Sequence, residues 1–142
     1  MGAKRVSEVK QELVGVPAPY GFESPASWIS RAALSQGIRV RELLKFFGLS
    51  RATDFDMDLS HKKSLIIAEL CGFSAERFAF STRMFSSLRS IDQSGSNFLF
   101  PFRDKCSRYR YCPCCLQQQR VKHFPLHWRF KPWRYCPIHD CL

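Results

Sequence analysis

Two short pairs of potential metal ligands lie near the C-terminus of this 142-residue chain. The first pair is Cys112 and Cys115, and after twenty intervening residues the second pair is Cys136 and His139. Thiolate sulfur and imidazole nitrogen are preferred ligands of Zn²⁺, and this spacing lets one tight turn direct both donors of a pair at one ion. Four protein ligands complete a tetrahedron and leave no position for water. The spacing therefore predicts a structural zinc site and not a catalytic one.

The remaining cysteines do not suggest a disulfide framework. The total of seven is odd, and the polar N-terminal segment lacks the apolar core of a secretion signal. A disulfide or redox role remains the alternative to zinc, and because Cys114 adjoins Cys115 the ligand choice within the first pair stays open. We expect the other cysteines to be buried small side chains or surface thiols: Cys71, Cys106 and Cys141.

Motifs that would indicate catalysis are missing from the sequence. It has no phosphate-binding glycine loop, no dinucleotide fingerprint and no Ser/His/Asp arrangement. Ten of the twelve carboxylates lie in residues 1–100, so the predicted zinc site has no obvious general base. We therefore expect a protein that is not an enzyme.

Positive charge is concentrated around the predicted zinc site. Residues 101–142 contain nine Lys and Arg against two Asp and Glu, whereas residues 1–100 contain 13 against 10. Such a density favours a polyanionic partner, most often nucleic acid, although a merely soluble basic surface is the alternative. Tyr109 and Tyr111 alternate with arginines, which suits base stacking as well as the packing of a small ribbon. The side chains predicted to contact phosphates here are Arg103, Arg108, Arg110, Arg129, Lys131 and Arg134.

The N-terminal part reads as helices separated by glycines. Ser24 and Pro25 are a typical helix start, and Gln36-Gly37 a typical end. A second helix should follow and stop at Gly48, which gives the form of a helix-turn-helix. Its exposed Arg39, Arg41 and Lys45 would reach phosphates or base edges, with a structural or protein-docking role as the alternative. The apolar residues predicted to face the core are Trp28, Ile29, Ala32, Ala33, Val40, Leu43, Leu44 and Phe47.

Further helices are expected before the cysteines. Asp54–Asp58 reads as a solvated acidic loop, and residues 62–71 as a helix with Leu65, Ile66, Ala68 and Leu70 on its apolar side. Another helix should begin at Ser74, and residues 90–97 read as a polar linker. The predicted fold is mainly α, with helical hairpins of helix-turn-helix character and a small zinc-ribbon or zinc-finger module. The predicted domains are a flexible lead-in (1–16), a helical domain (17–95) and a basic zinc module (96–142).

Several of these motifs together resemble the TniQ family. The N-terminal pattern is Pro19-x3-Glu23-Ser-x2-Ser27-Trp28-x2-Arg31, and Leu65-x2-Ala68-x3-Gly72 is similar to the next family segment. The zinc-finger signature is the more specific part: Arg110-Tyr111-Cys112-Pro-x-Cys115-Leu116, Trp128, and Cys136-Pro-x-His139. The resemblance runs from about residue 17 to the end. Longer family members continue beyond the last motif, so the chain resembles a short or truncated member.

This resemblance implies a target-selection protein of Tn7-like and mercury-resistance-type transposons. Such a protein would bind DNA at an integration site and engage the AAA+ ATPase of the element, and in some elements a CRISPR effector complex. The rival interpretation is a stand-alone helix-turn-helix and zinc-ribbon regulator that binds an operator. No segment is long and apolar enough for a membrane span, so we expect a cytoplasmic protein, associated with the nucleoid where it binds DNA. Loss of Cys112 or His139 should unfold residues 100–142 and leave the helical half largely intact.

Overall fold

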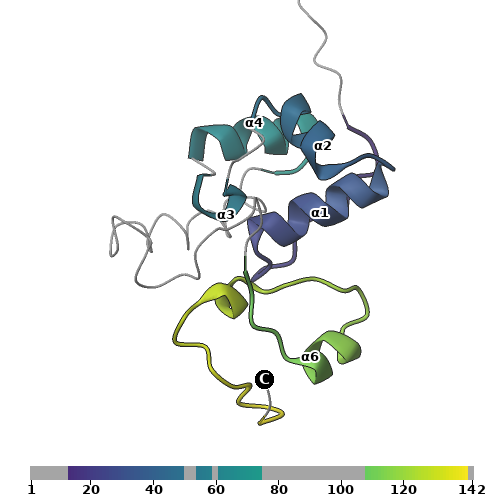
Figure 1. The fold of residues 1–142 in the computed structure, drawn as a ribbon. Helices are drawn as coiled ribbons and strands as arrows, with labels where there is room; N and C mark the ends of the chain where they lie inside the picture. Colours follow the sequence, from purple (N-terminus) through teal and green to yellow (C-terminus); the bar gives the residue numbers. More distant parts are fainter. Residues whose placement is uncertain (1–12, 50–53, 59–60, 75–107, 141–142) are drawn as a thin grey trace, which may run out of the picture.

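The computed structural model describes residues 13–49, 54–58, 61–74 and 108–140. Helices α1 to α4 form an upper group, here called the helical lobe (described residues 13–74), and the rest form the metal lobe (residues 108–140) (Figure 1). None of the described helices has the length and apolar character needed to cross a bilayer. The elements are α1 (Pro25–Ser35), α2 (Val40–Phe46), α3 (Phe55–Asp58), α4 (His61–Cys71), α6 (Pro113–Gln118) and the 3₁₀ turn η1 (Leu126–Arg129).

The mainly helical class is confirmed, but the predicted ribbon is not found. In the described part of the chain no strand forms, and the metal lobe contains a short helix and a 3₁₀ turn instead. The helix begins inside the first ligand pair because Pro113 occupies its first position, where a missing N–H costs nothing. The helix predicted from Ser74 onwards and the linker at 90–97 lie outside the described residues.

Helix α1 forms where the sequence predicts it. The Ser24 side chain accepts a hydrogen bond from the Ser27 amide at 3.1 Å, and Pro25 follows at the first helical position. The helix ends before Gly37, whose φ of +65° is the left-handed conformation that glycine adopts without strain. Its buried residues are Pro25 and the four predicted ones: Trp28, Ile29, Ala32 and Ala33.

Helix α2 packs on α1 through Leu43 and Leu44, both buried. The Glu42 carboxylate accepts a hydrogen bond from the Arg39 amide at 2.9 Å and so caps the first turn. The helix stops before Gly48, as predicted. Val40, which we expected on the buried side, is instead 36% exposed.

Helix α4 buries only two of the four residues predicted to face the core, Ala68 and Leu70. Its buried residues are Ser64, Ile67, Ala68, Leu70 and Cys71, whereas Leu65 and Ile66 are exposed. Positions 64, 67, 68 and 71 follow the three- and four-residue spacing of one helical face. The apolar run of this segment allows either face to appear hydrophobic, so the sequence pattern was right for Ala68 and Leu70 and wrong for Leu65 and Ile66.

The core of the helical lobe surrounds Trp28. Its indole lies against the rings of Phe47 and Phe73, and its Nε1 donates to the Pro17 carbonyl at 2.9 Å. Residues before α1 also close onto α4, since the Leu13 amide donates to the Leu70 carbonyl at 2.8 Å. These contacts fix α1 in the middle of the lobe.

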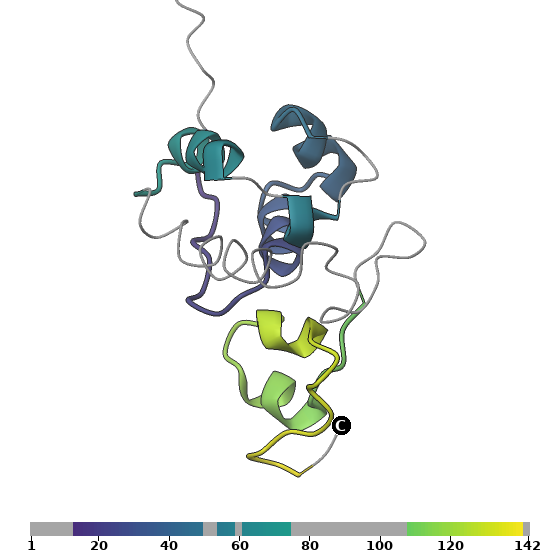
Figure 2. The ribbon, with the colours of Figure 1, turned by 90° about the vertical axis from the view of Figure 1, so that its left-hand side faces the viewer.

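The N-terminal end of α1 points towards the metal lobe, as both ribbon views show (Figures 1 and 2). The Ser24 amide donates to the Phe124 carbonyl at 2.9 Å, and the Leu126 amide donates to the Phe22 carbonyl at 2.7 Å. This pairing is an isolated antiparallel bridge centred on Glu23 and Pro125. The metal lobe is therefore joined through its backbone to the start of α1.

Candidate metal centre

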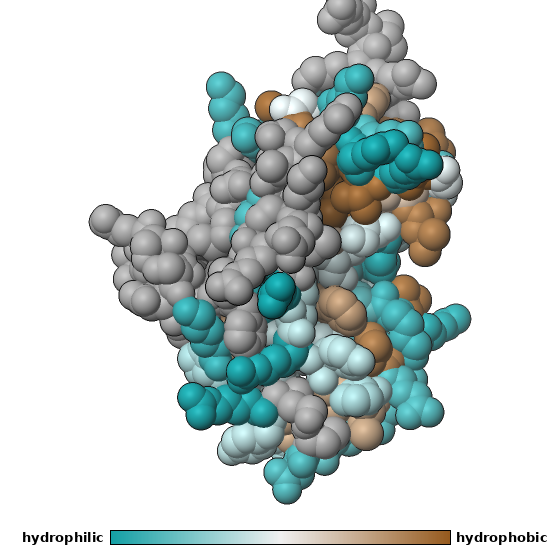
Figure 3. Space-filling model, in the orientation of Figure 1, coloured by the Kyte–Doolittle hydropathy of each residue, from teal (hydrophilic) through white to brown (hydrophobic). Residues whose placement is uncertain are grey.

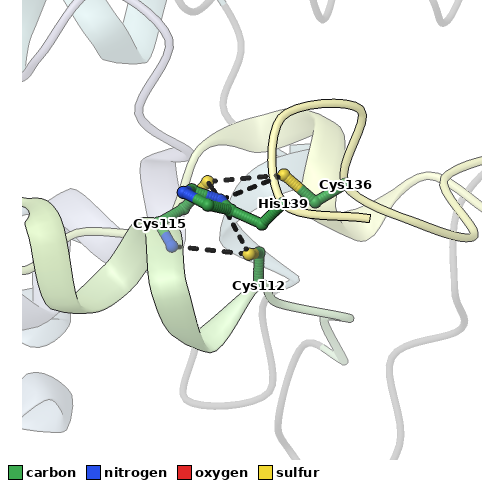
Figure 4. Close-up of side chains that lie close together, drawn as sticks. All are labelled: Cys112, Cys115, Cys136 and His139. Atoms are coloured by element: carbon green, nitrogen blue, oxygen red, sulfur yellow. Dashed lines mark hydrogen bonds between the residues drawn. The ribbon is translucent and has the colours of Figure 1, made fainter. Parts of the chain in front are cut away.

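Four potential ligands converge in the metal lobe: Cys112, Cys115, Cys136 and His139 (Figure 4). All four donor atoms lie within 4.8 Å of one another. Nδ1 of His139 is 3.4, 3.3 and 3.5 Å from the Sγ atoms of Cys112, Cys115 and Cys136, and the last two sulfurs are 3.5 Å apart. The structure thus brings together the four predicted residues, with Cys115 and not Cys114 as the fourth donor.

The local fold explains this convergence. Cys112 is the N-cap of α6, and its Sγ accepts a hydrogen bond from the Cys115 amide at 3.4 Å, which turns both thiols to the same side. In the second pair, the backbone amides of Ile138 and His139 donate to Cys136 Sγ. The Asp140 amide then closes the turn on the Cys136 carbonyl at 2.8 Å. Each pair is therefore a tight turn around a cysteine sulfur.

The donor set fits a tetrahedral zinc ion. Zn–S bonds of about 2.3 Å and Zn–N bonds of about 2.0–2.1 Å place tetrahedral ligand atoms roughly 3.5–3.8 Å apart. Four of the six separations are 3.3–3.5 Å, only slightly shorter, and all six are within 4.8 Å. Three sulfurs and one nitrogen also suit zinc better than magnesium or calcium, which prefer oxygen. A Cys₃His cluster of this kind could hold a metal ion without leaving an open position.

The protonation of the thiols is unequal in this arrangement. Loss of solvation and hydrogen bonds with Cys136 and Cys112 raise the pKa of Cys115 to about 12. Loss of solvation acts on Cys136 in the same sense, but the backbone amides of His139 and Ile138 and the His139 side chain lower its pKa overall. Crowded thiolates repel one another unless a cation lies between them, which is why metal binding to such a site releases protons.

Aromatic rings surround the cluster. The buried Trp128 packs beside Cys112 and Cys136, as expected, and Trp133 lies at the edge of the same small core. The His127 ring stands edge-on to Trp133 at 4.7 Å, and burial lowers its pKa. His123 instead stacks on Tyr20 at 4.3 Å. Among the residues that the structure describes, no second group of three or more Cys, His, Asp or Glu side chains assembles.

Most of the predicted phosphate-contacting residues are exposed. Arg39, Arg41 and Lys45 lie on the solvent side of α2, away from the contact with α1. On the metal lobe, Arg108, Arg110 and Arg134 are exposed, and Lys131 is half-buried. Arg103 lies outside the described residues. Their contact with nucleic acid stays a prediction, but their placement permits it.

Arg129 is the exception, and its predicted place on the surface is wrong. Its side chain is only 1% exposed, and its guanidinium binds two carboxylates of the helical lobe. Nη1 donates to Asp54 at 2.6 Å and to Asp56 at 3.0 Å, and Nη2 donates to the second oxygen of Asp54. The arginine is therefore committed to the junction of the lobes and has no donor face left for phosphate.

The acidic segment is correspondingly not the solvated loop we predicted. Asp56 is fully buried and lies in α3, where its Oδ1 accepts a hydrogen bond from the Ala26 amide of α1 at 2.7 Å. The Tyr109 hydroxyl donates to Oδ2 of Asp56 and lies 2.9 Å from the Ser24 hydroxyl. The predicted capping of α4 by Asp58 or Ser60 falls on side chains that the structure does not describe.

Burial and neighbouring charges shift the pKa values of three junction residues, in opposite directions at Asp56 and Arg129 and in the same direction at Tyr109. Burial raises the pKa of Asp56, although the Arg129 cation and the Tyr109 hydroxyl oppose the shift. Burial and the neighbouring Asp56 raise the pKa of Tyr109 well above its usual value. Burial would lower the pKa of Arg129, but hydrogen bonds and charge from Asp54 and Asp56 raise it overall. Sequence reasoning missed this network because its members lie up to 85 residues apart and share no motif.

Comparison with known proteins finds a family match that includes the four candidate metal ligands. The TniQ family model matches residues 14–142, which is nearly the whole chain and includes all four converging ligands. Proteins of this family are generally non-catalytic factors of transposition. No curated protein and no solved structure matches the chain. With a family match of this extent, the chain belongs to the TniQ family.

Proposed function

We propose that this transposition-associated protein is a zinc-loaded adaptor. It contacts DNA at the integration site and engages the AAA+ ATPase of its transposon. The observation that carries the proposal is the family match over residues 14–142. The Cys₃His cluster and the exposed basic side chains on both lobes support it independently.

In this proposal the metal is structural. Zinc bound by Cys112, Cys115, Cys136 and His139 would supply four bonds that hold two turns together in a lobe with very little apolar core. The chain's own contribution is to orient the sulfurs through backbone amides and to shield one side of the site with Trp128. Exposed arginines on the same lobe are then held in a fixed arrangement for phosphate contact.

The metal assignment is tested by the zinc content of purified protein. Wild type should contain one zinc per chain, and Cys115→Ser should contain none. Cys114→Ser is the matched control because Cys114 adjoins the site without contributing a donor. Equal zinc in all three proteins, or loss of zinc only from the Cys114 variant, would contradict the ligand set.

The adaptor role is tested with DNA and the ATPase encoded in the same element. We expect salt-sensitive, sequence-tolerant DNA binding that strengthens when the ATPase is added. Arg41→Gln and Arg134→Gln should each weaken it, and each should reduce the salt slope by about one. The rival regulator would instead give a symmetric footprint with half-sites about one helical turn apart, independent of the ATPase. That footprint would overturn the proposal.

A further inference from the structure

One lysine of the metal lobe is bound to the protein backbone. Hydrophilic residues lie at the edges of the described surface of this lobe in Figure 3, and Lys122 is itself an exposed residue. Its Nζ nevertheless donates to three carbonyls at the end of α6, those of Leu116 at 2.6 Å, Gln117 at 2.8 Å and Gln119 at 2.8 Å. An ammonium group has three N–H donors, so this arrangement uses all of them. The side chain is therefore held in one place although it lies at the surface.

Helix α6 gains from such a contact because it is short. It has six residues (Pro113–Gln118), too few for an isolated helix to be stable in water. The last four carbonyls of an α-helix have no partner within the helix, and Gln119 ends this one in an extended conformation with φ −66° and ψ 132°. Lysine side chains near a helix C-terminus bind such carbonyls and oppose the negative end of the helix dipole. Lys122 does both for α6.

The same helix carries the first ligand pair. Cys112 is its N-cap, and the Cys115 amide in its first turn donates to Cys112 Sγ at 3.4 Å (Figure 4). The Gln119 amide donates to the Cys115 carbonyl at 3.2 Å. The two ligands and the carbonyls that Lys122 binds therefore belong to one hydrogen-bonded segment. Fraying of its last turn would leave the position of Cys115 less well defined.

The residues that follow Lys122 are bound to the helical lobe. The His123 ring stacks on Tyr20 at 4.3 Å, and the Phe124 amide donates to the Ser27 hydroxyl at 2.9 Å. Lys122 thus lies between two fixed parts of the molecule. Its backbone continues into the contact with the helical lobe, and its ammonium group binds the helix that carries the metal ligands.

We propose that Lys122 is a positioning residue of the metal centre. It supplies no ligand atom, but it holds the last turn of α6 against the segment that is bound to the helical lobe, and so keeps Cys112 and Cys115 oriented for the ion before the ion binds. Preorganised ligands lose less conformational entropy on binding, which raises the affinity. The inference rests on the proposed zinc site and adds to it a residue outside the ligand set. It involves no chemical step.

The zinc affinity of the full chain tests this role. Competition with a chromophoric chelator measures it at one pH and one salt concentration. Lys122→Met keeps an unbranched stem without donors, and we expect the zinc dissociation constant to rise about three- to tenfold. Arg120→Met is the matched control, because it removes the same charge from an exposed side chain of the same segment. Its dissociation constant should change by less than about twofold.

Hydrogen exchange of the zinc-loaded proteins, followed by NMR, shows whether the effect is local. In Lys122→Met the amides of Leu116 and Gln119, which are hydrogen-bonded within α6, should exchange faster than in wild type. The Asp140 amide, in the turn of the second ligand pair, should keep its protection.

Three results would overturn the inference. They are an unchanged zinc affinity in Lys122→Met, an equal loss of affinity in Arg120→Met, and faster exchange of the Asp140 amide to the same extent as that of α6, which would show a general loss of structure. Each of them leaves the proposed zinc site standing as long as wild type binds zinc. Wild type that binds no zinc would refute the metal assignment and the inference together.

Discussion

The two lobes are stabilised in different ways. In the helical lobe, eleven buried residues form a continuous core around Trp28. In the described part of the metal lobe the corresponding buried cluster has three: Cys112, Trp128 and Cys136. Two of those three are ligands of the candidate metal site. Hydrophobic burial can maintain the first lobe, whereas the buried cluster described in the second is too small to offset the entropy of folding by itself, so under the proposed function this lobe depends on a bound metal.

Contacts at the junction of the two lobes make the stability of the helical lobe partly dependent on the metal lobe. Asp56 belongs to the helical lobe and is fully buried, yet its cation and its phenol donor, Arg129 and Tyr109, come from the metal lobe. A buried carboxylate without its partners is costly. The helical lobe has a core of its own, but it depends on the metal lobe for the charge balance at the start of α1.

Removal of the metal gives the largest expected effect and tests this dependence directly. With a strong chelator, amides of residues 108–140 should lose hydrogen-exchange protection because the four bonds that close both turns are gone. Amides near the start of α1, such as those of Ala26 and Ser27, should also exchange faster, since Asp56 and Ser24 lose Tyr109 and Arg129. Mass spectrometry after timed exchange measures both changes.

Amides in the middle of α2 serve as the internal reference for that experiment. Leu43 and Leu44 pack on α1 and touch no residue of the metal lobe among the contacts described, so their protection should fall least. If α1 exchanges at the same rate with and without metal, the lobes are independent, as the sequence alone suggested. Complete loss of protection in α2 would instead make the chain one cooperative unit.

Replacement of Arg129 by methionine comes next in size. The variant keeps much of the apolar stem but leaves Asp54 and Asp56 without their cation, and we expect a loss of about 3–5 kcal/mol in the free energy of unfolding. Urea denaturation of zinc-loaded protein measures it. Arg134→Met is the matched control, because an exposed arginine should change stability by no more than about 0.5 kcal/mol. Equal effects in both variants would refute the junction's role.

The loss of stability in Arg129→Met should depend on pH. Burial raises the pKa of Asp56 in the folded protein, so this carboxylic acid favours folding when protonated, and that contribution is lost as the pH rises through its folded pKa. Arg129 opposes the rise, and without it the pKa should be higher still. The deficit of Arg129→Met should therefore shrink as the pH is lowered within the range in which zinc remains bound. A deficit that grows on acidification would contradict this assignment.

Sequence alone predicted the parts of this molecule that are determined locally. The cap at Ser24, the stops at Gly37 and Gly48 and the buried face of α1 each depend on a few neighbouring residues. The four converging ligands were found because two turns of fixed spacing carry donors that zinc prefers. The family resemblance was confirmed over nearly the whole chain.

What sequence missed depends on contacts between distant segments. Arg129 looks like any other basic residue near the cysteines, and Asp54–Asp58 looks like a solvated loop. Only the fold shows that these two segments meet and neutralise each other. The exposed Leu65 and Ile66 of α4 were misassigned for the same reason, because the choice between two apolar helical faces is made by the partner and not by the helix.

Tyr109→Phe removes a single hydroxyl from the junction and should have an intermediate effect. The ring and its contact with Phe124 remain, but Asp56 loses a hydrogen bond and Ser24 loses its neighbour. Hydrogen bonds to charged groups contribute about 1.5–3 kcal/mol, and we expect a loss near the lower end because Arg129 still pairs with Asp56. Tyr111→Phe is the control, since that ring also contacts Phe124 but is half-exposed. Urea midpoints compare the two, and equal midpoints would show that the phenol contributes only packing.

The smallest expected effect compares one left-handed residue in each lobe. Asp140 has a φ of +52° in the turn that follows the second ligand pair, and Gly37 has +65° after α1. Asp140→Gly should relieve strain and tighten zinc binding about two- to fivefold, which corresponds to roughly 0.5–1 kcal/mol. Gly37→Ala should cost about 1 kcal/mol or more, from backbone strain alone, because nothing lies within 4 Å of the added methyl group. Competition with a chromophoric chelator measures the zinc affinity of Asp140→Gly, and urea denaturation measures the stability of Gly37→Ala. Asp140→Asn separates charge from strain, since asparagine tolerates the same conformation. Asp140→Gly could leave zinc affinity unchanged while Gly37→Ala destabilises the helical lobe. In that case left-handed backbone geometry would contribute to the stability of the helical lobe, whereas the metal–ligand bonds would determine the conformation of the metal lobe.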